Sequence, residues 1–280
     1  MIMQMLKDQV SDRSALQHAR QSQSPGMLTN LPRKRSLAAA TNFAVFNVTP
    51  YVSLDRLPYA AIVMIDVIGP VLKYGSWYSW GTLELNELIV RLAESDKVKG
   101  IILNIDSGGG QAAGTADFAG SIRLVSKLKP VIAIIQDGIA ASAAMWIASA
   151  AQEIYVTQPT DQVGSIGAYT TLFDVTKYLE QMGVVMRDIY APQSIDKNLD
   201  YREALTGKDD LIVEDLKFLV EHFIANVKAG RSGRIRIEGD EPFTGKMYNA
   251  QPAIKNGLID GIKSLPQAVN RLEQLIALRA

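Results

Sequence analysis

Between residues 60 and 156 the sequence alternates short apolar runs with stretches of helical periodicity, and no other feature narrows the possible folds as far. The apolar runs at 60–65, 100–105, 131–135 and 153–156 are short, as in strands buried on both faces. Residues 83–93, 112–128 and 140–151 have the composition and apolar spacing of helices. Strands that alternate with helices predict an α/β fold, with helices packed outside a parallel or mixed sheet.

The two ends of the chain differ from this central part. Two further amphipathic helices are predicted at 211–229 and 265–278. The N-terminal part is polar and basic, with Arg33-Lys34-Arg35, and has no sustained apolar period. We therefore expect a flexible extension over residues 1–57 and one globular domain over residues 58–280.

The composition excludes several classes of function. The chain has 280 residues, and its 29 basic and 29 acidic side chains cancel to a formal charge of zero. A neutral chain lacks the long-range field that attracts nucleic acids or acidic membranes, so neither partner is expected. Its apolar runs are far shorter than the roughly 18 residues that cross a bilayer, so we expect no membrane span and a cytoplasmic location. The absence of cysteine excludes thiolate metal sites and a cysteine nucleophile.

Several segments between the predicted elements could carry chemistry, and each also has a plain structural interpretation. Glycines at 108–110 follow a predicted strand, where they could turn backbone N–H groups toward an anion or simply form a turn. Ser142 lies among small residues at the predicted start of a helix, so it is either an N-cap or a nucleophile. Ser165 lies between two glycines in a predicted loop, and Lys197 lies in an irregular segment, where most lysines are solvated.

Four segments, taken together, resemble one family in the expected order. V-K-G-I-I-L-N-I-D-S-G-G-G at 98–110 is similar to that family's strand and D-S-P-G-G loop. Residues 141–146, A-S-A-A-M-W, resemble the family's A-S-G-G-Y-Y motif. Residues 163–167, V-G-S-I-G, resemble its T-G-S-I-G motif, and residues 253–260, A-I-K-N-G-L-I-D, resemble its A-x-x-x-G-L-V-D motif. The family is that of signal peptide peptidase A and the phage capsid assembly proteases (protease C). The resemblance covers about residues 59–275 and implies a serine peptidase domain with a ClpP/crotonase-like spiral of repeated β-β-α units.

The resemblance also implies a role for each matching residue. Ser142 matches the nucleophile, Lys197 the general base, and Ser165 the hydroxyl that orients the lysine. The backbone N–H groups of Gly109 and Ala143 are implied as the oxyanion hole. The sequence departs from the family where glycine replaces the usual proline at 108 and where alanines replace Gly-Gly at 143–144. These changes loosen the loop and narrow the site, but they remove no backbone N–H.

Composition independently favours lysine over histidine as the base. His18 lies in the predicted extension and His222 inside a predicted amphipathic helix, so neither suits a Ser-His-Asp triad. A lysine accepts a proton only when it is uncharged, so the pKa of such a base must fall from about 10.4 toward roughly 7 to 8. Lys177 and Lys208 are weaker rivals for the role of the base.

In this family active sites form where protomers meet, so the resemblance implies a homo-oligomer and an inactive monomer. It implies a protein or peptide substrate, and no cofactor or metal. The absence of a predicted membrane segment favours a phage or prophage capsid assembly protease in the host cytoplasm or the procapsid, with scaffold, portal or head proteins as partners. Three alternatives stay open: a bacterial cytosolic signal-peptide-peptidase-like protease, a crotonase-type acyl-CoA enzyme, and a catalytically silent scaffold-binding protein.

Overall fold

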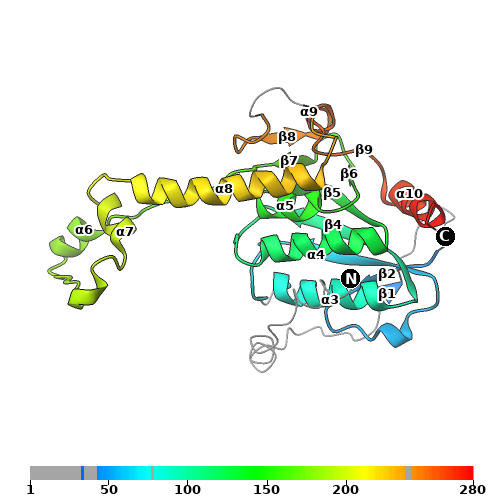
Figure 1. The fold of residues 1–280 in the computed structure, drawn as a ribbon, viewed down its shortest axis with the longest axis horizontal. Coiled ribbons are helices and arrows are strands. Elements are labelled where there is room, and N and C mark those ends of the chain that lie inside the picture. Colours follow the sequence, from blue (N-terminus) through cyan, green and yellow to red (C-terminus); the bar gives the residue numbers. More distant parts are fainter. Residues whose placement is uncertain (1–32, 35–42, 77–78, 237–240, 280) are drawn as a thin grey trace. The chain divides into compact units, whose positions relative to one another are not determined.

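The computed structural model describes residues 33–34, 43–76, 79–236 and 241–279 (Figure 1). The chain divides into two compact units, which are described separately below. Unit 1 comprises residues 1–166 and 223–280, and unit 2 comprises residues 167–222. The stretch predicted as one domain, 58–280, therefore includes all of unit 2 and residues 58–166 and 223–280 of unit 1.

A nine-stranded sheet forms the centre of unit 1. Its strands are β1 (Arg33–Lys34), β2 (Val45–Val48), β3 (Ala61–Ile68), β4 (Val98–Ser107), β5 (Val131–Ala141), β6 (Glu153–Val156), β7 (Gln162–Gly164), β8 (Met247–Asn249) and β9 (Gly261–Ile262). The strand order is β1-β2-β3-β4-β5-β6-β9, with β7 paired to β5 and β8 paired to β7. All pairs are parallel except β1–β2 and β7–β8.

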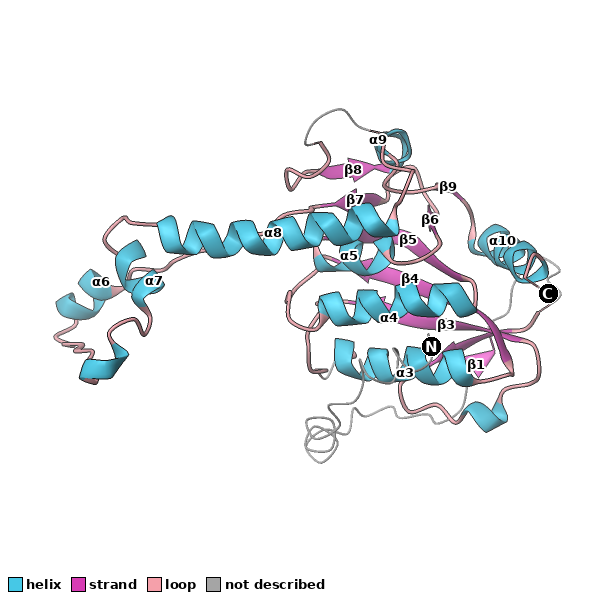
Figure 2. Cartoon of the chain, viewed as in Figure 1, coloured by secondary structure: helices cyan, strands magenta, loops and turns pink. Residues whose placement is uncertain are grey.

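Helices pack against both faces of this sheet (Figure 2). The helices of unit 1 are α3 (Thr82–Glu94), α4 (Thr115–Leu128), α5 (Ala143–Ser149), α9 (Ala250–Asn256), α10 (Leu265–Ala277) and the last turns of α8 (Asp210–Gly230). Ile62 and Ile102 join Leu272 of α10 in one apolar cluster. Ile101 and Leu103 point to the opposite face of β4 and are also fully buried. Because both faces are covered, these strands have the near-continuous apolar sequences noted above.

The predicted α/β class is confirmed, and the predicted strands and helices between residues 60 and 156 coincide with observed elements. The main difference is β5, which continues six residues beyond the predicted end at 135. Its first half pairs with β6 and its second half pairs with β7, so the strand is longer than its apolar run. The helix predicted over 140–151 consequently begins at Ala143.

The predicted N-terminal extension is wrong for residues 43–57. In this segment β2 pairs in parallel with β3, placing Val45 opposite Ile62. The side chains of Val45, Val52 and Leu57 expose 3% or less of their surface. The apolar run at 43–46 was the sequence signal for this strand, and its pairing with β3 makes it part of the core. The rest of the predicted extension, except residues 33–34, lies outside the described residues.

A buried ion pair fixes the C-terminal end of α8 to the sheet. The Arg231 guanidinium is fully buried and donates two hydrogen bonds to the Asp260 carboxylate, at 2.8 and 3.0 Å. Its Nε donates to the carbonyl of Gly257 at 3.1 Å. Asp260 also accepts the backbone N–H of Ile154 in β6 at 2.7 Å, so the pair joins α8 to the strand layer.

Unit 2 contains α6 (Thr176–Gln181), a short 3-10 helix (Pro192–Ser194), α7 (Leu199–Ala204) and the first turns of α8. Ala204 is its one buried residue. Its large apolar side chains are instead exposed, and the most exposed ones, between 74% and 87%, are Tyr169, Phe173, Val185, Ile189 and Phe218. Unit 2 therefore has almost no hydrophobic core of its own.

Candidate active site

Ser142 lies at the sharp turn between β5 and α5, in a backbone conformation that non-glycine residues rarely adopt. Its φ is 53° and its ψ is −122°. Its N–H donates to the Gly164 carbonyl at 2.9 Å, and its carbonyl accepts the Trp146 N–H at 3.0 Å. Its side chain makes no capping hydrogen bond to α5, although the residue occupies the N-cap position. The hydroxyl is therefore not engaged in the capping role that is usual for a serine at this position.

The glycine loop lies directly against this turn. A Cβ placed on Gly109 would be 2.7 Å from the Ser142 Cβ and 3.0 Å from the Ala143 backbone nitrogen. Only glycine permits this approach, and its φ of 92° is also one that favours glycine. Ala143 is the first residue of α5, where a backbone N–H has no acceptor within the helix. The structure thus brings Gly109 to Ser142 and Ala143, which lie more than 30 residues further along the chain.

Ser107 holds the glycine loop in place. Its Oγ donates to the Gly69 carbonyl at 2.5 Å and accepts the Gly109 N–H at 3.1 Å. The N–H of Gly109, predicted to be free for an oxyanion, is thus engaged with this hydroxyl. No role is predicted for Ser107 from the sequence, although its position directly before the three glycines was a usable signal.

Ser165 lies beside Ser142 because their two strands run in parallel. Ala141 at the end of β5 is paired with Gly164 at the end of β7, and a serine follows each of them. Adjacent strands lie about 4.8 Å apart, so the two serines leave the same edge of the sheet as neighbours. Ser165 also has a positive φ, 51°, and its N–H donates to the Lys246 carbonyl at 2.9 Å.

The buried carboxylate of Asp161 fixes the point from which these two strand segments start. It accepts the N–H of Gly138 at 3.0 Å, the N–H of Thr157 at 2.8 Å and the N–H of Gln158 at 2.9 Å. Gly138 lies four residues before Ser142, and Asp161 lies four residues before Ser165. Asp161 thus sets the register between the segments that carry the serines, a role that the sequence did not reveal. Its only signal was an aspartate at the start of a segment predicted as a loop, in which the structure places β7.

Lys197 lies in unit 2, as do the rival lysines Lys177 and Lys208. Its side chain is exposed, and its backbone N–H donates to the Ser194 carbonyl at 3.2 Å. In unit 1, Lys246 contacts Ser165 through its backbone carbonyl. The side-chain ammonium of Lys246 forms an ion pair with the Glu241 carboxylate, at 3.5 Å. The structure therefore groups Ser142, Ser165, Gly109 and Ala143 in unit 1, and the pairing with Lys197 stays a prediction.

Among the residues that the structure describes, histidine and acidic side chains form no alternative centre. His222 is an exposed residue of α8, and His18 lies outside the described residues. Within the described part of the chain, no group of three or more histidine, cysteine, aspartate or glutamate side chains could hold a metal ion.

None of the described helices is long and apolar enough to cross a membrane.

Comparison with known proteins identifies the family. The model of peptidase family S49 matches residues 123–279, which is more than half of the chain. The chain therefore belongs to peptidase family S49.

Two curated relatives come from phages. The chain is 44% identical over 175 residues to the head-tail preconnector protein GP5 of Enterobacteria phage P21, covering 62% of this chain and 34% of that protein. It is 31% identical over 209 residues to the capsid assembly protease C of Escherichia phage lambda, covering 71% and 45% respectively. The chain thus spans less than half of each of these relatives. A solved structure of the 1510-N membrane-bound stomatin-specific protease with a substrate peptide aligns with 76% of this chain, at 21% identity and a TM-score of 0.48.

Proposed function

We propose that this chain is a serine endopeptidase in which Ser142 is the nucleophile and Lys197 is the general base. The observation that carries the proposal is the turn at Ser142, which is strained, uncapped and in contact with Gly109. Strained residues concentrate at functional sites, and a strand-to-helix turn that exposes a serine is a known arrangement for a nucleophile. Membership of peptidase family S49 supports the same chemistry.

In the proposed first step, the uncharged Lys197 amine removes the hydroxyl proton of Ser142 while Oγ bonds to the carbonyl carbon of the substrate. The electron pair of the C=O bond moves to the oxygen, which accepts hydrogen bonds from the N–H groups of Ala143 and Gly109. Gly109 would then exchange its bond to Ser107 for the oxyanion. The C–N bond breaks as the lysine ammonium protonates the leaving amine. The uncharged lysine then takes a proton from water as the water oxygen bonds to the acyl carbon, and the C–Oγ bond breaks as the lysine returns a proton to Ser142.

Covalent labelling with a fluorophosphonate tests the nucleophile. Wild-type protein should be labelled at Ser142, and the Ser142→Ala variant should not. Lys197→Ala should abolish labelling, while Lys177→Ala and Lys208→Ala serve as matched controls from the same unit and should retain it. Equal labelling of the Lys197→Ala variant and its controls would refute the assignment of the base.

We further propose that the active form is a homo-oligomer in which unit 2 of one protomer meets another copy. The support is the exposed apolar surface of unit 2, which includes Phe173, Ile189 and Phe218 and would be unstable in water without a cover. Mixing Ser142→Ala protein with Lys197→Ala protein should restore part of the cleavage activity if the dyad is shared between chains. A mixture without activity would contradict this sharing.

The biological role we propose is cleavage of scaffold, portal or head proteins during phage capsid assembly. The support is the similarity to the capsid assembly protease C of phage lambda and to the preconnector protein of phage P21. Incubation with the products of neighbouring genes should show cleavage that the Ser142→Ala variant lacks. Cleavage that persists in that variant would reject the proposal.

A further inference from the structure

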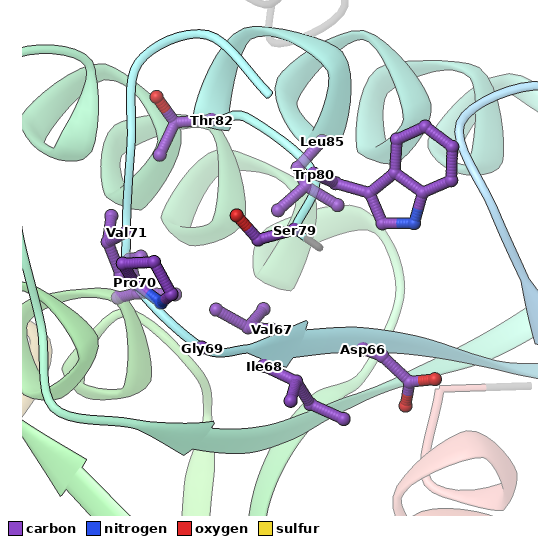
Figure 3. Close-up of a pocket in the computed structure, with 11 residues that line it drawn as sticks. Asp66, Val67, Ile68, Gly69, Pro70, Val71, Ser79, Trp80, Thr82 and Leu85 are labelled. Atoms are coloured by element: carbon purple, nitrogen blue, oxygen red, sulfur yellow. The ribbon is translucent and has the colours of Figure 1, made fainter. Parts of the chain in front are cut away.

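A pocket of about 250 Å³ lies between the carboxyl end of β3 and the helices α3 and α5 (Figure 3). Its floor is Val67 of β3, and its walls include Val71, Trp80, Leu85 of α3 and Ile147 of α5. Figure 3 shows the side chains of Val67, Val71, Trp80 and Leu85 around one space. The Trp80 ring is held by an edge contact with Tyr51, whose centroid lies 5.5 Å away.

One side of the pocket follows a strand edge that is open among the described residues. The pairing of β2 with β3 ends at Val48, opposite Ile65. From Asp66 onward, no described strand pairs with β3 on that side. Ile68 exposes 47% of its surface there, and Pro70 ends the edge. An extended chain can therefore approach the pocket from this side.

The pocket is connected to the candidate active site through hydrogen bonds. Gly69 in its wall accepts from the Ser107 hydroxyl, and the same hydroxyl accepts from the N–H of Gly109. Gly109 in turn contacts the turn at Ser142. Ile147 belongs to α5, the helix that begins directly after Ser142. A substrate whose scissile bond reaches Ser142 therefore has residues within a few positions of this pocket, because an extended peptide advances about 3.3 Å per residue.

The lining favours an uncharged, largely apolar group, because besides Asp66 its polar side chains are the hydroxyls of Ser79 and Thr82. Val67, Leu85 and Ile147 expose 5% or less and offer no polar atom to a ligand. The acidic residue at the rim, Asp66, already accepts the side-chain amides of Asn47 at 2.9 Å and Asn104 at 2.7 Å. A charged ligand group would lose its hydration here and would find no free charged side chain to compensate for that loss. The volume is below the 300 to 1,000 Å³ typical of sites for whole small molecules, so it suits one side chain.

We infer that this pocket binds one large apolar side chain of the peptide substrate and thereby selects the residue at one position close to the cleaved bond. The inference rests on the proposed peptidase function. It adds a specificity-determining set, Val67, Leu85 and Ile147, to the residues that act on the scissile bond. A peptide that offers alanine at this position leaves most of the pocket unfilled and is cleaved more slowly.

The test compares cleavage of a peptide library, varied one position at a time among alanine, leucine, phenylalanine and lysine. Val67→Phe fills the pocket and should lower kcat/KM for leucine and phenylalanine relative to alanine by about tenfold or more, at one position only. Leu85→Ala enlarges the pocket and should shift the preference at the same position toward phenylalanine. Leu85→Ala also provides an independent test of the pocket if Val67→Phe does not fold. Leu272→Ala, a core truncation against α10 on the other face of the sheet, is the control and should leave the preference unchanged.

The possible results separate this inference from the proposed function. Opposite shifts in the two pocket variants, with an unchanged control, would support the pocket. Cleavage that depends on Ser142 but shows the same preference in all variants would overturn the pocket and leave the peptidase proposal intact. If no peptide is cleaved in a Ser142-dependent way, both proposals fail.

Discussion

Replacing Ser142 by alanine distinguishes a nucleophile from a helix cap, because the two roles predict different costs in stability. A capping serine loses about 1 kcal/mol when it becomes alanine. Ser142 makes no capping bond, so we expect its removal to change the free energy of unfolding by less than about 0.5 kcal/mol. Ser264 is the matched control, since its Oγ accepts the Gln267 N–H at the start of α10 and its own N–H donates to the Gln267 side chain.

The backbone strain at Ser142 predicts a second, independent change in stability, between the glycine and alanine variants. A non-glycine residue in such a conformation costs about 1 to 3 kcal/mol, and glycine removes most of this cost while losing about 0.5 to 1 kcal/mol in chain entropy. Ser142→Gly should therefore be more stable than Ser142→Ala by up to about 2 kcal/mol. In a chain of this size, each kcal/mol corresponds to roughly 2 to 4 °C in Tm.

Thermal unfolding followed by circular dichroism measures these differences, and fluorophosphonate labelling measures reactivity in the same samples. We expect Ser142→Ala to match wild type in Tm but to lose labelling, Ser264→Ala to lose Tm but to keep labelling, and Ser142→Gly to exceed Ser142→Ala in Tm. The reasoning is refuted if Ser142→Ala loses as much stability as Ser264→Ala and labelling persists, because Ser142 would then be only a cap.

Two further predictions concern residues around the site and the pH dependence of stability. Asp161→Ala should slow labelling of Ser142 at least tenfold at temperatures well below the Tm of the variant, because the register between β5 and β7 loses the hydrogen bonds that hold it. An equally destabilised Leu272→Ala variant should be labelled at the wild-type rate. Equal slowing of both variants would contradict the proposed role of Asp161. Lys129, which donates to the carbonyls of Leu92 and Ser95 at the end of α3, has its pKa lowered to about 8, first by burial and then by Lys99. Below pH 8 the folded and unfolded chains both carry this proton, and from pH 8 to about 10 the unfolded chain binds more of it, so stability should rise with pH over that range. Chemical denaturation of wild type and Lys129→Met at several pH values measures this effect, and an identical pH dependence in the two proteins would count against it.

The sequence alone determined the strands and helices that follow from the pattern of neighbouring side chains. Apolar runs and helical spacing located β3, β4, β6, α3 and α4, because burial on a strand or on one face of a helix leaves a period in the chain. The small residues around Ser142 and the glycines at 108–110 marked two segments that could carry chemistry. The resemblance then implied that these residues form one active site.

Only the tertiary structure decided which of these parts meet. Pairing of β5 with β7 places Ser165 beside Ser142, and the approach of Gly109 completes the group, although up to 56 residues separate its members along the chain. Long-range pairing also adds β2 to the sheet, and the contact between Asp161 and Gly138 ties the start of β7 to the second half of β5. Such contacts join residues whose neighbours in sequence carry no trace of them, because hydrogen bonds between strands use backbone groups that every residue shares.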